Sequence, residues 1–199
     1  IQAAAMYWQA YLFSEFKTDI GLMTAKTLAH ANYSLSACKL FESFKIEEMD
    51  GESLAYYLYA LRQQGRVQEA YSLFPYVNQF NIPKTSWARA IILLDLNKVE
   101  EARFLLEPLE KTDKDGHITI LLHAVYLALN DKKAVKSLLD RAIQRIPNND
   151  YFCCQRIAID ILNGLNKTPI ETYRAFKRFD LIDAADYLHK HADKHLRHS

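Results

Sequence analysis

Four histidines crowd the C-terminal end of the chain and are its best candidates for metal chemistry. They are His189, His191, His195 and His198. On a helix, His191 and His195 lie one turn apart on the same face, a spacing that can ligate zinc. Neither a cysteine nor a nearby carboxylate completes a convincing ligand set. The pattern therefore favours a solvated helix over a metal centre.

Two further features could carry acid–base chemistry. The densest acidic run comprises Glu47, Glu48, Asp50 and Glu52, and paired carboxylates can act as general acid and base. The run precedes an expected helix start, where negative charge is solvated or favours the helix dipole. His123 interrupts an apolar helical segment, so we interpret it as a satisfied core histidine instead of a catalytic base.

The cysteines and the known catalytic motifs offer no route to an enzyme. Cys38, Cys153 and Cys154 form an odd, unpatterned set, which suits a reducing compartment and idle or buried thiols. A Walker loop, a serine nucleophile elbow and an HExxH helix are all missing from the sequence. We predict a non-catalytic intracellular protein, nuclear or cytoplasmic, with no catalytic residue, no cofactor and no metal site.

Charge and hydropathy disfavour nucleic acid and membrane partners. The net charge is +1, with 25 basic and 24 acidic residues interspersed, so the chain has no overall field to attract a phosphate backbone or an anionic membrane. The longest apolar stretch, residues 118–129, is shorter than the ~20 residues that span a bilayer. The opening IQAAAMYWQAYLF has no basic region before its apolar residues, which is unlike a secretory signal.

The elements that must position these residues follow an internal repeat. Small turn residues recur at intervals of 33, 32, 33 and 34 residues, each between two apolar helical segments: Asn32, Gly65, Asn97, Asn130 and Gly164. Asn and Gly tolerate a left-handed backbone at a helix end, so each is predicted to close one helix and let the chain reverse. The period indicates helical hairpins in tandem.

Apolar positions repeat in phase with these turns. Five residues after the turns stand Ala37, Ala70, Ala102 and Val135, and nine after stand Phe41, Phe74, Leu106, Leu139 and Tyr173. Seven residues before them stand Ala25, Leu58, Ala90, His123 and Ile157. Such spacings place small residues where antiparallel helices cross and bulky ones in the groove between successive pairs.

The segments LAYYLYALRQQGRVQEAYSLF (54–74) and SWARAIILLDLNKVEEARFLL (86–106) resemble the tetratricopeptide repeat. The resemblance implies an all-α, helical-hairpin solenoid wound as a right-handed superhelix, with about five repeats plus terminal helices. We expect one domain over 1–199, with an N-terminal helix at 1–17, repeats at 18–180 and a capping helix at 181–199. Pro169 stands where a small residue is expected, which indicates a modified last repeat.

Chaperone-binding tetratricopeptide domains clamp a terminal carboxylate with cationic and amide side chains at fixed repeat positions. Only one of the equivalent positions in this sequence holds a basic residue. These positions are occupied by Leu22, Lys26, Ala55, Tyr59, Trp87 and Ile91. A chaperone adaptor is therefore disfavoured.

Aromatic density at the N-terminus points to self-association. The expected first helix has almost no polar side, and the second full repeat begins with a tyrosine-rich helix. The candidate self-association residues are therefore Tyr7, Trp8, Tyr11, Leu12, Phe16, Tyr56 and Tyr59. If exposed, such residues mark a protein interface, with Tyr and Trp as anchors. The alternative is a thick intramolecular core.

Several segments also resemble the cell-division-cycle tetratricopeptide subunits of the anaphase-promoting complex, a ubiquitin ligase of mitosis. They are Tyr7-Trp8-Gln9-Ala10, YSLSACKLFESF (33–44), GRVQEAYSLF (65–74) and LDLNKVEEARFLL (94–106). The resemblance implies a homodimerising scaffold domain that contacts other subunits of a large complex, with catalysis elsewhere. It is weakened by an extra helix after Trp8 and by a short 111–116 segment where relatives carry a long insertion.

Two other classes of function stay open. One is a monomeric tetratricopeptide adaptor that binds an extended peptide of an unrelated partner in its groove. The other is an enzyme hidden in a helical solenoid, which would need a cleft of convergent titratable groups. The sequence does not identify the partner, because solenoid surfaces vary while the period stays fixed.

Overall fold

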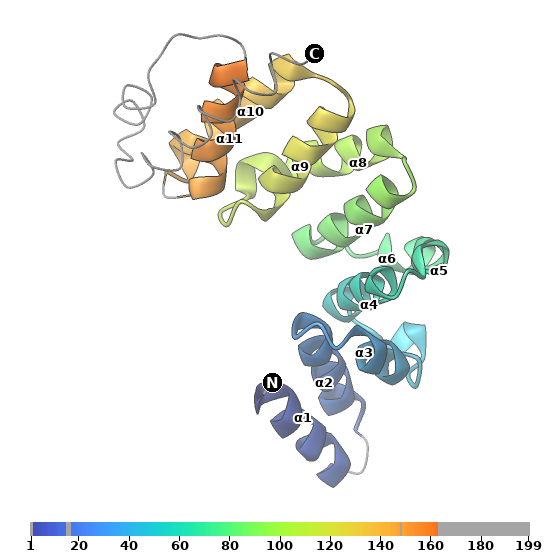
Figure 1. Ribbon diagram of the computed structural model, residues 1–199. Coiled ribbons are helices and arrows are strands. Elements are labelled where there is room, and N and C mark those ends of the chain that lie inside the picture. Colours follow the sequence, from blue (N-terminus) through green and yellow to red (C-terminus); the bar gives the residue numbers. More distant parts are fainter. Residues whose placement is uncertain (1, 15–16, 148, 163–199) are drawn as a thin grey trace. The chain divides into compact units, whose positions relative to one another are not determined.

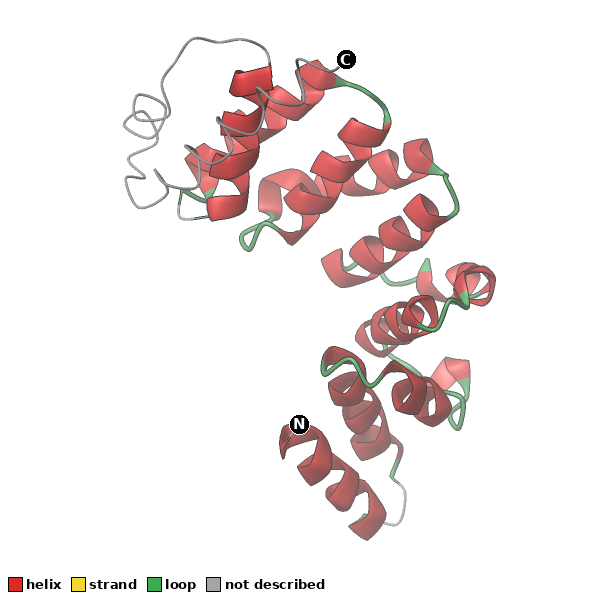
Figure 2. Cartoon of the chain, in the orientation of Figure 1, coloured by secondary structure: helices red, strands yellow, loops and turns green. Residues whose placement is uncertain are grey.

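The computed structural model describes residues 2–14, 17–147 and 149–162, and these residues form α-helices, two 3-10 helices and connecting turns, without a strand (Figure 2). The all-α prediction is confirmed for this part of the chain. The elements are α1 (Gln2–Phe13), α2 (Thr18–His30), α3 (Ser34–Phe41), η1 (Ile46–Glu48), α4 (Gly51–Gln63), α5 (Val67–Ser72), α6 (Phe74–Val77), α7 (Pro83–Asp95), α8 (Val99–Leu106), η2 (Glu107–Thr112), α9 (His117–Ala128), α10 (Lys132–Arg145) and α11 (Asp150–Leu162). In these residues no helix is long and apolar enough to cross a membrane.

Four of the five predicted turn residues close helical hairpins with a left-handed backbone. Their φ angles are 63° at Asn32, 73° at Gly65, 58° at Asn97 and 54° at Asn130. After each of them, the next backbone N–H donates to the carbonyl five residues back, as Tyr33 does to Leu28 at 2.9 Å and Lys98 to Leu93 at 2.7 Å. This is the Schellman closure, which satisfies carbonyls at the helix end. The turn prediction is confirmed four times, and Gly164 lies outside the described residues.

Gly65 offers a clean test of this backbone requirement, because a Cβ added there would meet nothing within 4 Å. Gly65→Ala is therefore expected to lower the free energy of unfolding by about 1–2 kcal/mol through the left-handed backbone alone. Urea unfolding followed by circular dichroism measures the loss. The neighbouring substitution Gln64→Ala, at an exposed residue with a negative φ of −88°, is the control and should change stability by less than about 0.5 kcal/mol. Equal effects at both positions would contradict the strain argument.

Contacts divide the chain into two compact units, Ile1–Leu109 and Glu110–Ser199. In the first unit, α1, α2, α4 and α7 pack one after another as a layer of first helices (Figure 1). The second helices, α3, α5 and α8, each pack against the first helix of their own hairpin. In addition, α3 contacts α4 and α5 contacts α7, so each hairpin also packs on the next. Whether the predicted single domain spans both units stays a prediction.

The core of the first unit uses the phased positions named from the sequence. Small residues where the helices cross are fully buried: Ala25, Ala37, Ala70, Ala90 and Ala102. Bulky buried residues such as Phe41, Leu58 and Leu106 fill the spaces between hairpins. Since Ala lets two helix backbones approach closely, this alternation allows successive hairpins to pack at a regular spacing.

The second hairpin departs from the regular pattern. Its second helix is interrupted, with α5 ending at Ser72 and α6 beginning at Phe74. Pro75 explains the interruption, because proline has no N–H to donate to the carbonyl four residues back. Phe74 and Val77 are buried in α6, so the predicted core position Phe74 is kept although the helix is not continuous.

In the second unit, α9 and α10 form a hairpin and α11 packs against α10. Asp113 caps the start of α9, accepting from the backbone N–H of Gly116 at 3.1 Å and of Thr119 at 2.8 Å. The predicted core positions Val135, Leu139 and Ile157 are buried. Of the predicted fifth hairpin, the first helix is α11, whereas its turn at Gly164, its second helix and the capping helix at 181–199 lie outside the described residues.

Candidate self-association surface

Helix α1 contains no charged residue, and its apolar residues occur on every side (QAAAMYWQAYLF). Among the described residues, its main packing partner is α2. Tyr11 is buried there, with its ring edge toward Phe44 at a centroid distance of 6.3 Å. A Cβ at Gly21 of α2 would overlap the Phe44 ring and lie 2.8 Å from Tyr11 Cε2. The glycine therefore permits this close approach of α1.

A hydrogen bond also fixes α1 on α2. Thr24 is fully buried, and its hydroxyl shares its one proton between the Tyr7 carbonyl oxygen, 3.0 Å from Oγ1, and the Ile20 carbonyl oxygen, 2.7 Å from it. This bond sets which side of α1 faces α2, because Tyr7 and Tyr11 lie one turn apart.

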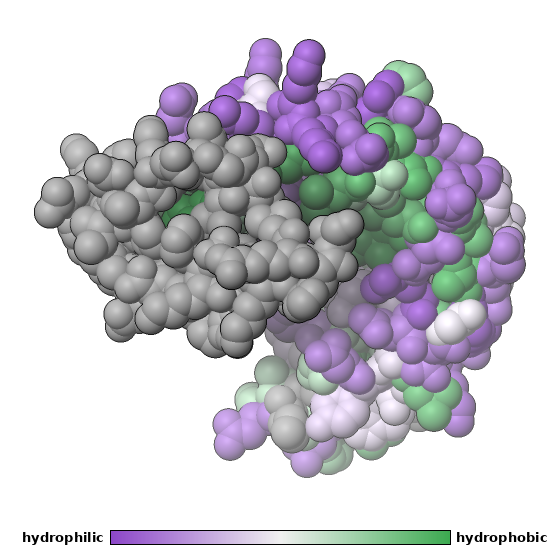
Figure 3. Space-filling model, turned by 45° about the horizontal axis from the view of Figure 1, so that its top comes forward, coloured by the Kyte–Doolittle hydropathy of each residue, from purple (hydrophilic) through white to green (hydrophobic). Residues whose placement is uncertain are grey.

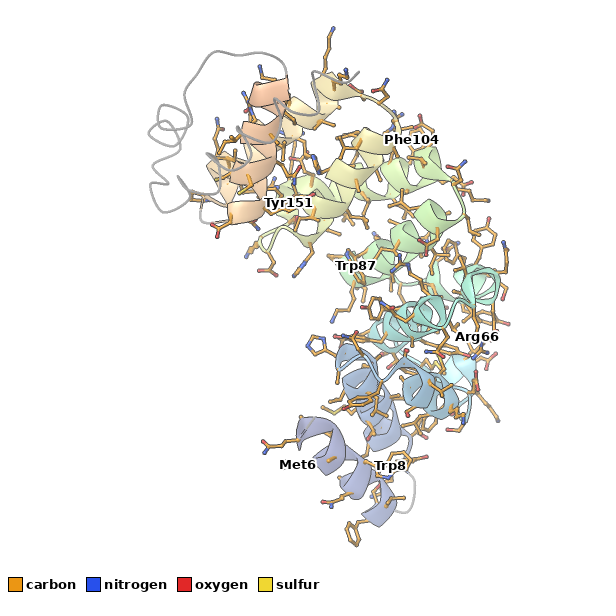
Figure 4. The ribbon with its side chains drawn as sticks, viewed as in Figure 1. Met6, Trp8, Arg66, Trp87, Phe104 and Tyr151 are labelled. Atoms are coloured by element: carbon orange, nitrogen blue, oxygen red, sulfur yellow. The ribbon has the colours of Figure 1, made fainter. Side chains whose placement is uncertain are left out.

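The opposite side of α1 exposes large apolar side chains, which we call the α1 apolar face: Met6, Trp8, Leu12 and Phe13. Met6 is 70% and Phe13 88% exposed, while Trp8 and Leu12 are nearly half exposed. Figure 4 labels Met6 and Trp8 on α1. On each of the other described helices at most one large hydrophobic residue is exposed. Apolar areas also interrupt the polar surface on the face drawn in Figure 3. Four exposed large hydrophobic residues gather on one uncharged helix, which makes this face the candidate self-association surface.

The predicted residues of α4 lie on the same layer of first helices, with α2 between α1 and α4. Tyr56 is half-buried, and its hydroxyl accepts from Lys84 Nζ at 3.3 Å while its ring lies edge-on to His30 at 6.4 Å. Tyr59 packs against Trp87 of α7 with ring centroids 5.8 Å apart. These rings join adjacent helices and leave part of their surface exposed.

The seven predicted self-association residues thus fall into different environments. Trp8 and Leu12 are exposed on the α1 apolar face, Tyr11 is buried beneath it, and Tyr7 is half-buried. Tyr56 and Tyr59 belong to the α4 surface, and Phe16 lies outside the described residues. The prediction omitted Met6 and Phe13, the two most exposed. Because the whole helix lacks charge, the sequence could have predicted that these two residues also belong to the surface.

Lys26, the cation at the clamp positions of the first helices, is engaged by acidic side chains. Its Nζ lies 3.8 Å from Asp50 Oδ2 and 3.6 Å from Glu52 Oε2. Leu22 and Ala55 are buried, while Tyr59, Trp87 and Ile91 are partly exposed. The surface of the first helices therefore presents aromatic and aliphatic groups, and its lysine is already neutralised.

The acidic run has structural partners. Asp50 caps α4, with Oδ1 accepting from the Ser53 backbone N–H at 2.6 Å. Burial alone would raise the pKa of Asp50, but hydrogen bonds from Ser53 hold this pKa below its usual value. Lys84 donates to Glu52 at 2.6 Å and lowers the pKa of that carboxyl. Both groups stay ionised at neutral pH, so neither has the raised pKa of a general acid.

His123, Cys38 and Cys153 are core residues, whereas Cys154 is partly exposed. His123 is buried, with Nδ1 2.8 Å from the hydroxyl of Tyr151, which is labelled in Figure 4, and burial lowers its pKa. Its Nε2 has no hydrogen-bond partner, so the histidine is only half satisfied. Burial raises the pKa of the Cys38 thiol to about 11, which makes a thiolate scarce at neutral pH. Among the described residues, no three His, Cys, Asp or Glu side chains are grouped to hold a metal; the C-terminal histidines lie outside them.

Comparison with known proteins adds no relative: no protein-family model, no curated protein and no solved structure matches this chain.

Proposed function

We propose that this chain is a non-catalytic scaffold module built from tetratricopeptide-like repeats, and that it forms a homodimer through the α1 apolar face. The observation that carries the proposal is the uncharged helix α1, which buries Tyr11 against its own chain and leaves Met6 and Phe13 largely exposed. The hairpins packed in tandem support the repeat fold, and their continuation as a right-handed solenoid belongs to the proposal.

A second copy of the chain is the occupant that the surface chemistry favours. The α1 apolar face presents protruding, uncharged side chains. The first-helix surface around Tyr59 and Trp87 presents partly exposed rings and the aliphatic Ile91. Both surfaces occur on one chain, so two copies related by a two-fold axis can satisfy them reciprocally. Lys26 on this surface is paired with Asp50 and Glu52, so it is not an unpaired cation that would call for an anionic partner.

The dimer is tested by sedimentation velocity across micromolar concentrations. The wild-type chain is expected to dimerise, and Phe13→Glu to weaken the dimer by about 700-fold, since each hot-spot side chain contributes about 2 kcal/mol and occurs twice, about 4 kcal/mol in all. Phe104→Glu is the matched control, because Phe104 is also an exposed phenylalanine but lies on α8 (Figure 4). A monomeric wild-type chain, or equal effects of the two substitutions, would overturn the proposal.

The wider assembly that we propose is the anaphase-promoting complex, in the nucleus or cytoplasm. The support is the likeness of residues 7–10, 33–44, 65–74 and 94–106 to its tetratricopeptide subunits. Affinity purification of the full-length protein, with identification of what travels with it, tests this. Recovery of the protein without other ubiquitin-ligase subunits would leave the homodimer proposal standing and reject this assembly.

The runner-up function is a monomeric adaptor that binds an extended peptide. The observation in its favour is the Tyr59–Trp87 ring pair on the first helices, which suits a peptide as well as a second copy. A monomeric wild-type chain in the sedimentation experiment would favour this function.

A further inference from the structure

A pocket of about 410 Å³ lies in the first unit between the second and third hairpins. Its walls include Tyr71 of α5, Phe74 of α6 and Asn78 just after it, together with Arg89 of α7 and Glu101 of α8. The pocket forms where Pro75 interrupts the second helix of the hairpin. Arg89 is two residues from Trp87, so it points to nearly the opposite side of α7. The pocket is therefore separate from the first-helix surface and from the α1 apolar face.

Arg89 enters this pocket as a cation without a counter-ion. Its guanidinium lies over the Phe74 ring, with Cζ 5.3 Å from the ring centroid. Its Nε is buried and has no hydrogen-bond partner, and no carboxylate of the described residues forms an ion pair with it. Burial lowers the pKa of Arg89, and no opposing charge offsets that effect. A half-buried, unpaired guanidinium is unfavourable until an anion binds it.

The acidic residue of the pocket is already occupied. Glu101 pairs with Lys98 at 3.2 Å, and Lys98 Nζ also donates to the Tyr71 hydroxyl at 2.7 Å. Glu101 is therefore engaged away from Arg89. The two cations, Arg89 and Lys98, and the one anion, Glu101, leave a net charge of +1, which a singly charged anion balances better than a doubly charged phosphate. One singly charged carboxylate is the anion that this balance accepts.

The remaining wall is aromatic. Tyr71 and Phe74 lie with their ring centroids 4.9 Å apart, and Pro75 adds an apolar edge. A volume of about 410 Å³ accommodates one or two side chains. Asn78 provides an amide that can donate to and accept from a peptide backbone.

We propose that this pocket binds an aspartate or glutamate side chain of a partner protein, with an adjacent aromatic or aliphatic residue packed against Tyr71 and Phe74. Arg89 takes the carboxylate, and its planar fork can do so through two parallel hydrogen bonds. The site would let one module dimerise through α1 and recruit an acidic-apolar segment through its second helices. It does not depend on the homodimer.

The test measures fluorescence anisotropy of the full chain with short synthetic peptides. Each peptide has one glutamate beside phenylalanine or leucine in a Gly-Ser frame, and matched versions carry glutamine or phosphoserine at the glutamate position. Saturable binding is expected for the glutamate peptides only. Arg89→Gln should reduce the affinity by about 10-fold or more, because a charge-assisted hydrogen bond is lost.

Arg103→Gln is the matched control. Arg103 also lies over a ring, that of Phe104 at 5.2 Å, but it is already paired with Glu100 at 3.1 Å and Glu107 at 3.7 Å. Its substitution should leave peptide binding unchanged. Circular dichroism of both variants checks that they fold, and Arg89→Lys, which keeps the charge, should bind with intermediate affinity.

Four outcomes would each overturn the proposal: no saturable binding by the acidic peptides, equal binding of the glutamine peptide, tighter binding of the phosphoserine peptide, or unchanged binding by Arg89→Gln. The same titration on Phe13→Glu separates the two proposals. Loss of the dimer there with peptide binding retained supports two independent surfaces.

Discussion

Replacing Phe41 by alanine is expected to lower the free energy of unfolding of the first unit by about 3–5 kcal/mol. Phe41 is fully buried at the end of α3, and its ring lies 5.2 Å from that of Tyr57 on α4. The substitution removes a side chain shared by two successive hairpins and leaves a cavity. Tryptophan fluorescence measures the change, because Trp8 and Trp87 are the chain's two tryptophans and both lie in this unit.

Leu35→Ala provides the control for this prediction. Leu35 lies on the same helix, α3, but is 56% exposed, so its truncation should change stability by less than about 0.5 kcal/mol. A loss of less than about 1 kcal/mol in Phe41→Ala would mean that α3 does not share a core with α4. The tandem packing of the hairpins would then be wrong at this junction.

Replacing Glu110 by glutamine is expected to destabilise the second unit by about 2–3 kcal/mol, as removal of one partner of a buried ion pair does. The side chain of Glu110 is about one-tenth exposed. Its carboxylate accepts hydrogen bonds from the Arg141 guanidinium at 2.8 Å and 3.0 Å and from that of Arg145 at 3.3 Å. Because Arg141 itself reaches solvent, the loss stays below that of a fully buried pair. Urea unfolding gives the free energy, and hydrogen exchange of the α9 and α10 amides locates it.

The effect of Glu110 should depend on pH. Burial would raise the pKa of Glu110, but the guanidinium groups of Arg141 and Arg145 outweigh it and hold this pKa below its usual value. A carboxyl whose pKa is lowered by folding stabilises the protein above its unfolded pKa of about 4.3. That contribution is lost as the pH falls through the lower folded pKa. The stability difference between the wild-type chain and Glu110→Gln should be full at neutral pH and shrink below about pH 4.

Glu107→Gln is the comparison for Glu110. Glu107 belongs to the same 3-10 helix, η2, but is exposed, and Arg103 lies 3.7 Å from it. An exposed pair of this kind contributes about 0.3–0.5 kcal/mol. If the two substitutions had equal effects, the assignment of Glu110 as a buried anchor of α10 would be rejected.

The turn residues show why part of the fold could be read from the sequence. Asn32, Gly65, Asn97 and Asn130 adopt the left-handed backbone that few other residue types accept, so their identity and spacing predicted the hairpins directly. The phased alanines, such as Ala37 and Ala70, could be placed in the core for a similar local reason. A small residue repeated on one helical face has few uses other than close packing.

Other features depended on contacts between distant residues. Tyr11 and Phe13 are both aromatic residues of one uncharged helix, yet Tyr11 is buried and Phe13 is 88% exposed. The difference arises from Gly21 and Thr24 on α2, which admit the Tyr11 side of α1 and bond to it. Periodicity could not choose that side, because α1 is apolar on every side.

The sequence by itself determined the helical hairpins, their period and their small-residue crossings, because each follows from backbone preferences and spacing within about 33 residues. Only the tertiary structure decided which α1 side chains stay exposed and that Glu110 holds two arginines. It also decided that Arg89 faces a pocket whose own carboxylate, Glu101, is paired with Lys98 instead. These outcomes depend on which side chains from different helices meet, and desolvation and ion pairing act only once they do.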